Sequence, residues 1–142
     1  MRRVTLACTL LLSLIAAGCG DNDDNTDTGS TPTEPSDTVT DTFSGTLTRN
    51  GGTSHPFPVI SAAGGDVVAT LRSVSPDSST VLGMALGTWN GTSCQAVIAN
   101  DRAVVSASIL GRATSVGTLC LRIYDVGTVV EPQDYEVEVV HP

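Results

Sequence analysis

Few residues of this 142-residue chain have the types and spacing that catalysis requires. His55 precedes a proline, His141 lies next to the C-terminus, and these are the two histidines of a chain that contains no lysine. No Gly-x-Ser-x-Gly or Ser-x-x-Lys sequence occurs, so the common settings of a serine nucleophile are absent. Four aspartates fall at expected turns, where Asp commonly bonds the backbone: Asp66, Asp77, Asp101 and Asp125. We therefore expect no catalytic residues and no enzymatic activity.

The N-terminus has the order of segments that is typical of a secretory signal. Two arginines precede an apolar stretch over residues 4–17, which is shorter than the roughly 20 residues that a membrane-spanning helix needs. Residues 14–19, Leu-Ile-Ala-Ala-Gly-Cys, resemble the lipobox of bacterial lipoproteins. The resemblance implies that residues 1–18 are a signal peptide. It also implies that Cys19 is acylated, for example with palmitate, and anchors the chain in a lipid bilayer.

The residues around the cysteines predict a compartment and a disulfide. Gly20 stands where an Asp would retain an enterobacterial lipoprotein in the inner membrane, so the resemblance favours the outer membrane, on its periplasmic face or at the cell surface. Cys8 leaves with the signal and Cys19 carries lipid, so Cys94 and Cys120 remain of the four cysteines. Because the compartment outside the inner membrane is oxidising, we expect a disulfide between them and no metal site there.

Residues 19–41 are expected to be the lipidated cysteine and a disordered acidic linker. Seven acidic residues, two prolines and no base lie between residues 20 and 41. Such a segment cannot bury enough apolar surface to offset its ordering entropy. Its Asp and Asn residues from 21 to 27 are hard oxygen ligands, so calcium binding stays an alternative. An EF-hand loop would need Gly and Glu where Thr26 and Pro32 stand, and we therefore expect no cofactor.

Residues 42–142 suffice for one domain. They hold eight of the 15 acidic residues and five arginines, so most of the net charge of −8 belongs to the linker. No basic patch indicates a nucleic-acid partner. Val- and Thr-rich segments alternate with Gly, Ser, Asn and Asp clusters, and residues 134–140 show the clearest apolar and polar alternation. A helix remains an alternative to a strand only for residues 81–86. The pattern predicts an all-β domain, an antiparallel β-sandwich of about eight short strands.

The same alternation predicts the core and one edge of the sandwich. Pro56 and Pro58 remove two backbone donors from one side of a strand, so the segment around Phe57 should be an edge strand. Cys120 should face outward, where its bridge would join a strand to a loop. The expected core comprises Leu47, Phe57, Val59, Val67, Ala69, Leu71, Leu82, Met84, Leu86, Val97, Val105, Ile109, Leu119, Leu121, Ile123, Tyr135, Val137 and Val139.

Several of these segments are similar to the bacterial pre-peptidase C-terminal domain. They are SGTL at 44–47, FPV at 57–59, AAG at 62–64, VVATL at 67–71, GTLCLRIY at 117–124 and DYEVEV at 134–139. The resemblance implies a jelly-roll-like sandwich that is not catalytic, that accompanies secreted peptidases and that aids secretion or substrate binding, with calcium in some relatives. This chain departs from the family's Asp-rich positions at residues 54–56 and 80–84, which puts calcium use in doubt.

Trp89 and Asn90 are the candidate ligand-binding residues. Trp89 precedes the turn sequence Asn90-Gly91-Thr92, and a tryptophan at a loop rim can stack on a sugar ring, although packing is the alternative role. We expect a membrane-anchored lipoprotein that presents a non-catalytic binding or adhesion module to an extracytoplasmic polysaccharide, other polymer or protein. The alternative is a structural or accessory envelope lipoprotein that has a protein partner and no ligand of its own.

Overall fold

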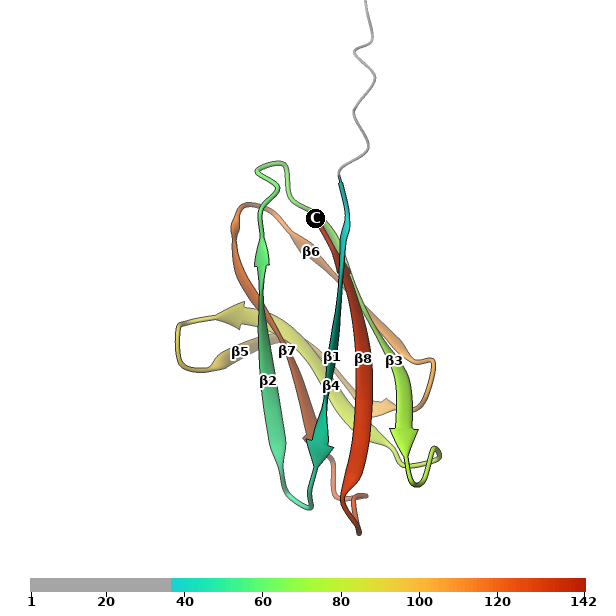
Figure 1. Cartoon of the computed structure of the whole chain (residues 1–142). Coiled ribbons are helices and arrows are strands. Elements are labelled where there is room, and N and C mark those ends of the chain that lie inside the picture. The colour runs from blue at the N-terminus through green and yellow to red at the C-terminus, as the bar shows by residue number, and fades with distance from the viewer. Residues whose placement is uncertain (1–36) are drawn as a thin grey trace, which may run out of the picture. The chain divides into compact units, whose positions relative to one another are not determined.

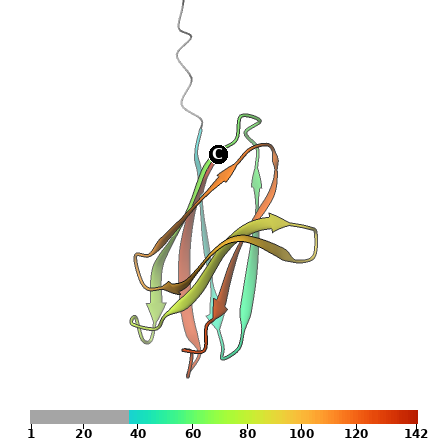
Figure 2. The same ribbon diagram turned by 180° about the vertical axis from the view of Figure 1, so that it is seen from behind.

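The computed structural model describes residues 37–142, which form two antiparallel sheets packed face to face (Figures 1 and 2). The expected signal peptide, Cys19 and the linker up to residue 36 lie outside the described residues. The eight strands are β1 (Val39–Leu47), β2 (Gly52–Val59), β3 (Gly65–Ser75), β4 (Leu82–Trp89), β5 (Cys94–Ala103), β6 (Ser108–Ala113), β7 (Gly117–Asp125) and β8 (Gln133–His141). The expected domain start at residue 42 is therefore three residues late, because β1 begins at Val39.

The order of strands is that of a jelly roll. Sheet A has the order β1-β8-β3-β6 and sheet B has the order β2-β7-β4-β5. Only β4 and β5 are neighbours both in the chain and in a sheet, and every other connection crosses from one sheet to the other. This arrangement confirms the expected sandwich and resolves residues 81–86 as strand. No helix occurs between residues 37 and 142, and so none there could span a membrane.

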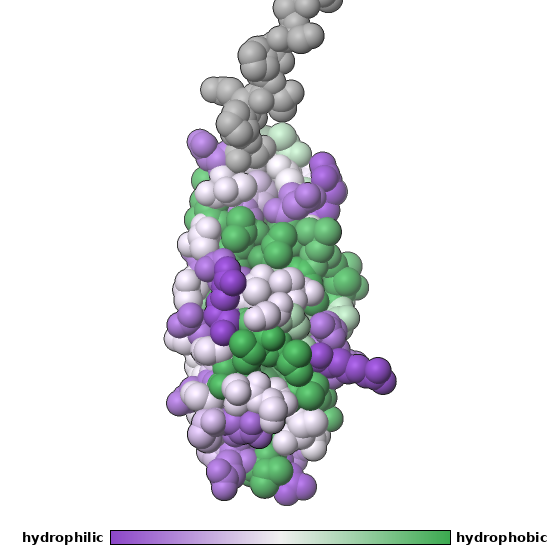
Figure 3. Space-filling model, turned by 90° about the vertical axis from the view of Figure 1, so that its right-hand side faces the viewer, coloured by the Kyte–Doolittle hydropathy of each residue, from purple (hydrophilic) through white to green (hydrophobic). Residues whose placement is uncertain are grey.

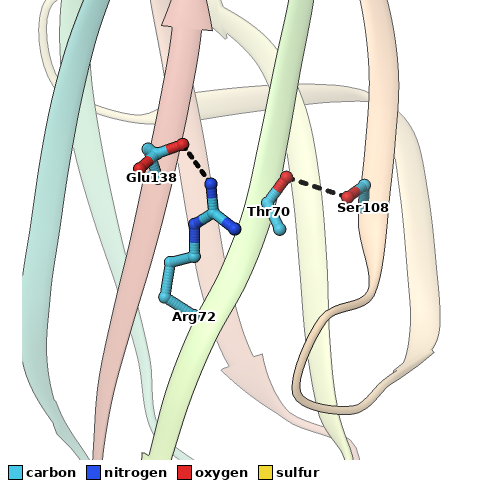
Figure 4. Close-up of polar contacts among 4 residues, drawn as sticks. All are labelled: Thr70, Arg72, Ser108 and Glu138. Atoms are coloured by element: carbon cyan, nitrogen blue, oxygen red, sulfur yellow. Dashed lines mark hydrogen bonds and ion pairs between the residues drawn. The ribbon is translucent and has the colours of Figure 1, made fainter.

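The core lies between the sheets, where inward side chains of both meet. β8 alternates buried Tyr135, Val137 and Val139 with outward acidic residues, as the sequence predicts. On the outer face of sheet A the Arg72 guanidinium bonds the Glu138 carboxylate (Figure 4). Most of the expected core is confirmed, with Val105 and Leu119 only partly buried. Four further apolar residues belong to it: Val74, Ala103, Ala113 and Val129.

Two β-bulges explain why strict alternation predicts the wrong face of the sheet for some residues. The register of β3 against β8 shifts between Leu71 and Ser73, so Val74 takes the inward place that strict alternation gives to Ser73. The register of β5 against β4 shifts at Val97, which the sequence predicts to be buried. That prediction is wrong, since Val97 is 76% exposed. A bulge inserts one unpaired residue and re-aims the side chains beside it, and no composition signal marks its position.

β2 is an edge strand, as the two prolines predict. It pairs with β7 alone, and Pro56 and Pro58 lie opposite Cys120 and Thr118. The edge position is required because a proline in a central strand would leave a neighbour's carbonyl unpaired. Phe57, between the prolines, points inward and is almost fully buried.

Candidate functional site

The β4–β5 hairpin carries the predicted ligand-binding residues. The loop between the two strands projects from the sandwich in both ribbon views (Figures 1 and 2). Trp89 ends β4, Cys94 begins β5, and the two residues are directly paired. Paired residues of antiparallel strands point to the same face, so the half-buried indole shares the outer face of sheet B with the cystine. Residues 87–100 contain no charged side chain.

The polar groups of Asn90 are engaged within the turn. Its Oδ1 accepts from the Thr92 amide at 2.9 Å, the Thr92 hydroxyl at 3.0 Å and the Ser93 amide at 2.8 Å. Its Nδ2 donates to the Ser93 hydroxyl at 3.1 Å. Gly91 has a φ of 98°, which a side chain would strain, so the sequence Asn-Gly is needed to close this loop. Asn90 therefore shapes the hairpin, and Trp89 is the side chain left to face a ligand.

The predicted disulfide between Cys94 and Cys120 is present, with a Cα–Cα separation of 5.7 Å. It joins the first residue of β5 to β7, two strands away in sheet B, and so passes across β4. Gly87 of β4 is paired with Cys120 on one side and Ala96 on the other. The bridge therefore joins two strands, and not a strand to a loop as the sequence suggests. Because it begins at the base of the loop, it fixes the direction in which Trp89 is presented.

A second group of polar residues lies on the outer face of sheet B, and sequence reasoning missed it. The Tyr124 ring lies across Gly83, where a Cβ would overlap the ring atoms, and its hydroxyl bonds the Asp101 carboxylate. Burial and then the contact with Asp101 raise the pKa of Tyr124 to about 12. Beside the ring is a shallow hollow of about 550 Å³ that Arg102 and Thr128 also line. The residues come from three separate segments, which the pairing of β4 with both β5 and β7 brings together.

The Asp125 carboxylate, at the rim of that hollow, ties two loops together. One oxygen accepts from the amides of Gly127, Thr128 and Val129 at 2.7, 2.9 and 3.0 Å, and the other accepts from the Asn50 amide at 2.8 Å. Burial opposes its ionisation, but the four amide donors outweigh burial and lower the pKa of Asp125. Asp125 therefore stabilises turns by accepting bonds from the backbone, as the sequence predicts.

Both histidines lie between the two sheets, among aromatic rings. The Nε2 atom of His55 is 2.8 Å from the Tyr135 hydroxyl, and its ring stacks on Phe43 with centroids 5.0 Å apart. His141 is buried, with its Nε2 atom 3.1 Å from an oxygen of Asp41. Burial lowers the pKa of His55 and raises the pKa of Tyr135, so each is held in its neutral form. Within residues 37–142 no three His, Cys, Asp or Glu side chains converge as metal ligands would.

Comparison with known proteins supports the fold alone. No protein-family model and no curated protein matches this chain, so the similarity to pre-peptidase C-terminal domains stays a prediction. Among solved structures, the crystal structure of Yersinia pseudotuberculosis-derived mitogen is similar, with a TM-score of 0.52 over 71% of this chain and 84% of that chain. The two sequences are 17% identical, so the likeness is one of β-sandwich architecture.

Proposed function

We propose that this chain is a bacterial lipoprotein whose β-sandwich domain is a non-catalytic binding module for an extracytoplasmic polysaccharide. One observation carries the proposal: a half-buried tryptophan stands at the base of a projecting hairpin that a disulfide holds in place. A ring that is already held in place loses little conformational entropy when it stacks on a sugar. The domain needs no catalytic group for this role.

The surroundings of Trp89 favour a neutral polymer over an ion or a nucleic acid. The hairpin between residues 87 and 100 carries no charge, and its exposed side chains include Thr88, Thr92, Ser93 and Gln95. Hydroxyl and amide groups beside an aromatic ring form the kind of site that hydrogen-bonds a sugar while the ring covers its apolar face. The acidic linker of the proposed lipoprotein would hold this surface away from the bilayer.

Trp89 is the sole tryptophan of the chain, so its fluorescence reports on the hairpin alone. The segment Glu34–Pro142 is a compact unit that contains the eight described strands, their core and the disulfide, and it is suitable for a titration by itself. Soluble peptidoglycan fragments and chito-oligosaccharides are the probes, with gelatin as a protein probe. We expect a saturable change in emission with a saccharide, and calorimetry should show that Trp89→Ala abolishes the binding.

Val130→Ala is the matched control, because Val130 is 84% exposed and lies in the β7–β8 connection. It should bind as the wild type does. Saccharide binding that survives Trp89→Ala would contradict the assigned site. If no saccharide binds and gelatin does, the ligand class is wrong. If nothing binds, the accessory role with a protein partner replaces the proposal.

The anchor has its own test in the full chain. Cells fed a labelled fatty acid should incorporate it into the wild type and not into Cys19→Ala. The wild type should fractionate with the outer membrane, and the variant should lose membrane attachment. A Cys8→Ala variant is the matched control and should still be labelled. Labelling of Cys19→Ala, or its retention in the membrane, would overturn the lipoprotein proposal without touching the binding site.

A further inference from the structure

The four edge strands of the two sheets differ in how they are protected from pairing with another strand. Natural sheets protect their edges with prolines, bulges, charges or inward-pointing polar groups. β2 carries Pro56 and Pro58, β5 has two register shifts along β4, and β1 points Asp41 inward. β6 has an unbroken register with β3, and its one charge, Arg112, is paired with Asp66 on the outer face. β6 is therefore the least protected edge of the described domain.

The backbone of β6 offers three residues to a new neighbour. The Leu71 amide of β3 donates to the Ala107 carbonyl at 2.9 Å, just before β6 begins. Antiparallel bonding alternates along an unbroken register, so every second residue from Ala107 onward bonds β3. The amide and carbonyl groups of the residues between them point away from the sheet. Those outward residues are Ser108, Leu110 and Arg112.

An apolar row on the outer face of sheet A ends at this edge. Val140 of β8 is in register with Val68 of β3, and Val68 is in register with Leu110, which is 63% exposed. The next row is polar, and its Thr70 and Ser108 hydroxyls are 2.8 Å apart (Figure 4). The side of the domain on which β3 lies in Figure 1 shows apolar areas between polar ones (Figure 3). The row thus presents a large apolar side chain where the sheet stops.

The inner side of the same edge is apolar too. Between β5 and β6 the two sheets part around a cavity of about 120 Å³. Gly111 faces it without a side chain, and a Cβ there would lie 3.4 Å from the Cδ1 atoms of Leu86 and Ile98. The bulge directs the exposed Val97 to its mouth, and Val67 and Leu119 complete the apolar walls. A neighbour on β6 would therefore meet apolar surface on both faces of the sheet.

We propose that β6 is the docking surface for a second copy of this chain, with the two β6 strands antiparallel about a two-fold axis at Leu110. In this register Leu110 faces Leu110 of the second copy, and Ser108 faces Arg112 of the second copy. All three outward residues of each β6 strand then exchange backbone hydrogen bonds with the other copy. The two copies of sheet A together form one continuous eight-stranded sheet. A shift by one residue would set outward groups against groups already bonded to β3.

The side chains complement one another in this register. The two exposed leucines cover each other and continue the apolar row, and Ile109 of the second copy lies opposite Gly111, where a side chain is missing. Ser108 lies opposite Arg112, so no like charges are paired. The two Arg112 residues are four positions apart along the strands, about 13 Å, and beyond the screening length of about 8 Å at physiological ionic strength.

The pairing between the two β6 strands is short, so we expect a weak dimer whose formation depends on protein concentration. Five residues of each strand overlap, and interfaces below about 1,200 Å² are usually weak and transient. The dimer should therefore form at high protein concentration and dissociate on dilution. Sedimentation equilibrium of Glu34–Pro142 should show a monomer–dimer equilibrium, and Leu110→Lys should abolish it because a charge would then face its own copy. Leu110 points to solvent, so this variant should keep the wild-type circular dichroism spectrum.

Val130→Lys is the matched control, because Val130 is an exposed apolar residue away from the edge, and this variant should dimerise as the wild type does. The register is tested with a short bismaleimide crosslinker. Leu110→Cys should crosslink to itself, whereas Ser108→Cys should crosslink when mixed with Arg112→Cys and fail to crosslink alone. A wild type that stays monomeric up to millimolar concentration, or a Leu110→Lys variant that still dimerises, would overturn the proposal. Crosslinking of Ser108→Cys to itself would refute the register.

Discussion

The disulfide should make a large contribution to the free energy of unfolding of the domain. Cys94 and Cys120 are 26 residues apart in sequence. The loop that they close holds β5, β6 and two crossings between the sheets, so the unfolded chain gains much freedom when the bridge is lost. The chain-entropy relation gives about 3.5 kcal/mol for a loop of this length. For a domain of this size, that loss should lower Tm by about 15 °C.

The change to make is the double variant Cys94→Ala/Cys120→Ala in Glu34–Pro142, and the assay is urea denaturation followed by circular dichroism. The midpoint should fall and the slope should rise, because the denatured chain without the bridge exposes more surface. Reduced wild type is the control, since it keeps both sulfur atoms and loses only the bond. Cys120 is fully buried, so the difference between the two samples measures the packing of its side chain.

A small effect would refute the loop-closure reasoning. If both the reduced wild type and the double variant lose less than about 1 kcal/mol, the bridge does not restrict the unfolded state as the entropy relation requires. If only the double variant is destabilised, the contribution comes from packing at Cys120 and not from the cross-link.

Three further predictions follow from single positions. Burial lowers the pKa of His55 from 6.5, so the imidazole binds a proton more tightly in the unfolded chain than in the folded one. The contribution of His55 to stability should therefore be complete above pH 6.5 and should be lost as the pH falls through the lowered pKa. Thermal melts at a series of pH values should show this loss in the wild type and a smaller one in His55→Phe. Gly83→Ala should cost about 1–3 kcal/mol in chemical denaturation, because its Cβ would displace the Tyr124 ring. Gly111→Ala should cost less, because its Cβ would come no nearer than 3.4 Å to its neighbours. Asp125→Ala should destabilise the domain at neutral pH, because four amides lose their acceptor. The difference in stability between variant and wild type should shrink in acid, as the wild-type carboxylate is protonated through its lowered pKa. Faster hydrogen exchange at Gly127 and Thr128 would show that the loop is freed.

The sequence alone predicts the strands and most of the core, because a half-buried strand must alternate. Tyr135, Val137 and Val139 are buried and the acidic residues between them are exposed, since one face of β8 meets the other sheet. Pro56 and Pro58 locate an edge because a missing amide donor is a local property of the residue. The cystine follows from a count of cysteines.

Only the tertiary structure decides which strands are neighbours and where the alternation slips. The bulge that exposes Val97 depends on how β5 fits against β4, and no residue type encodes it. Tyr124 meets Gly83 because β7 lies beside β4, a pairing between segments about 40 residues apart, and it reaches Asp101 because β5 lies on the other side of β4. The unprotected edge at β6 exists because the jelly-roll order leaves that strand last in its sheet. Local chemistry predicts what each residue prefers, whereas proximity between distant segments arises only when the whole core is packed.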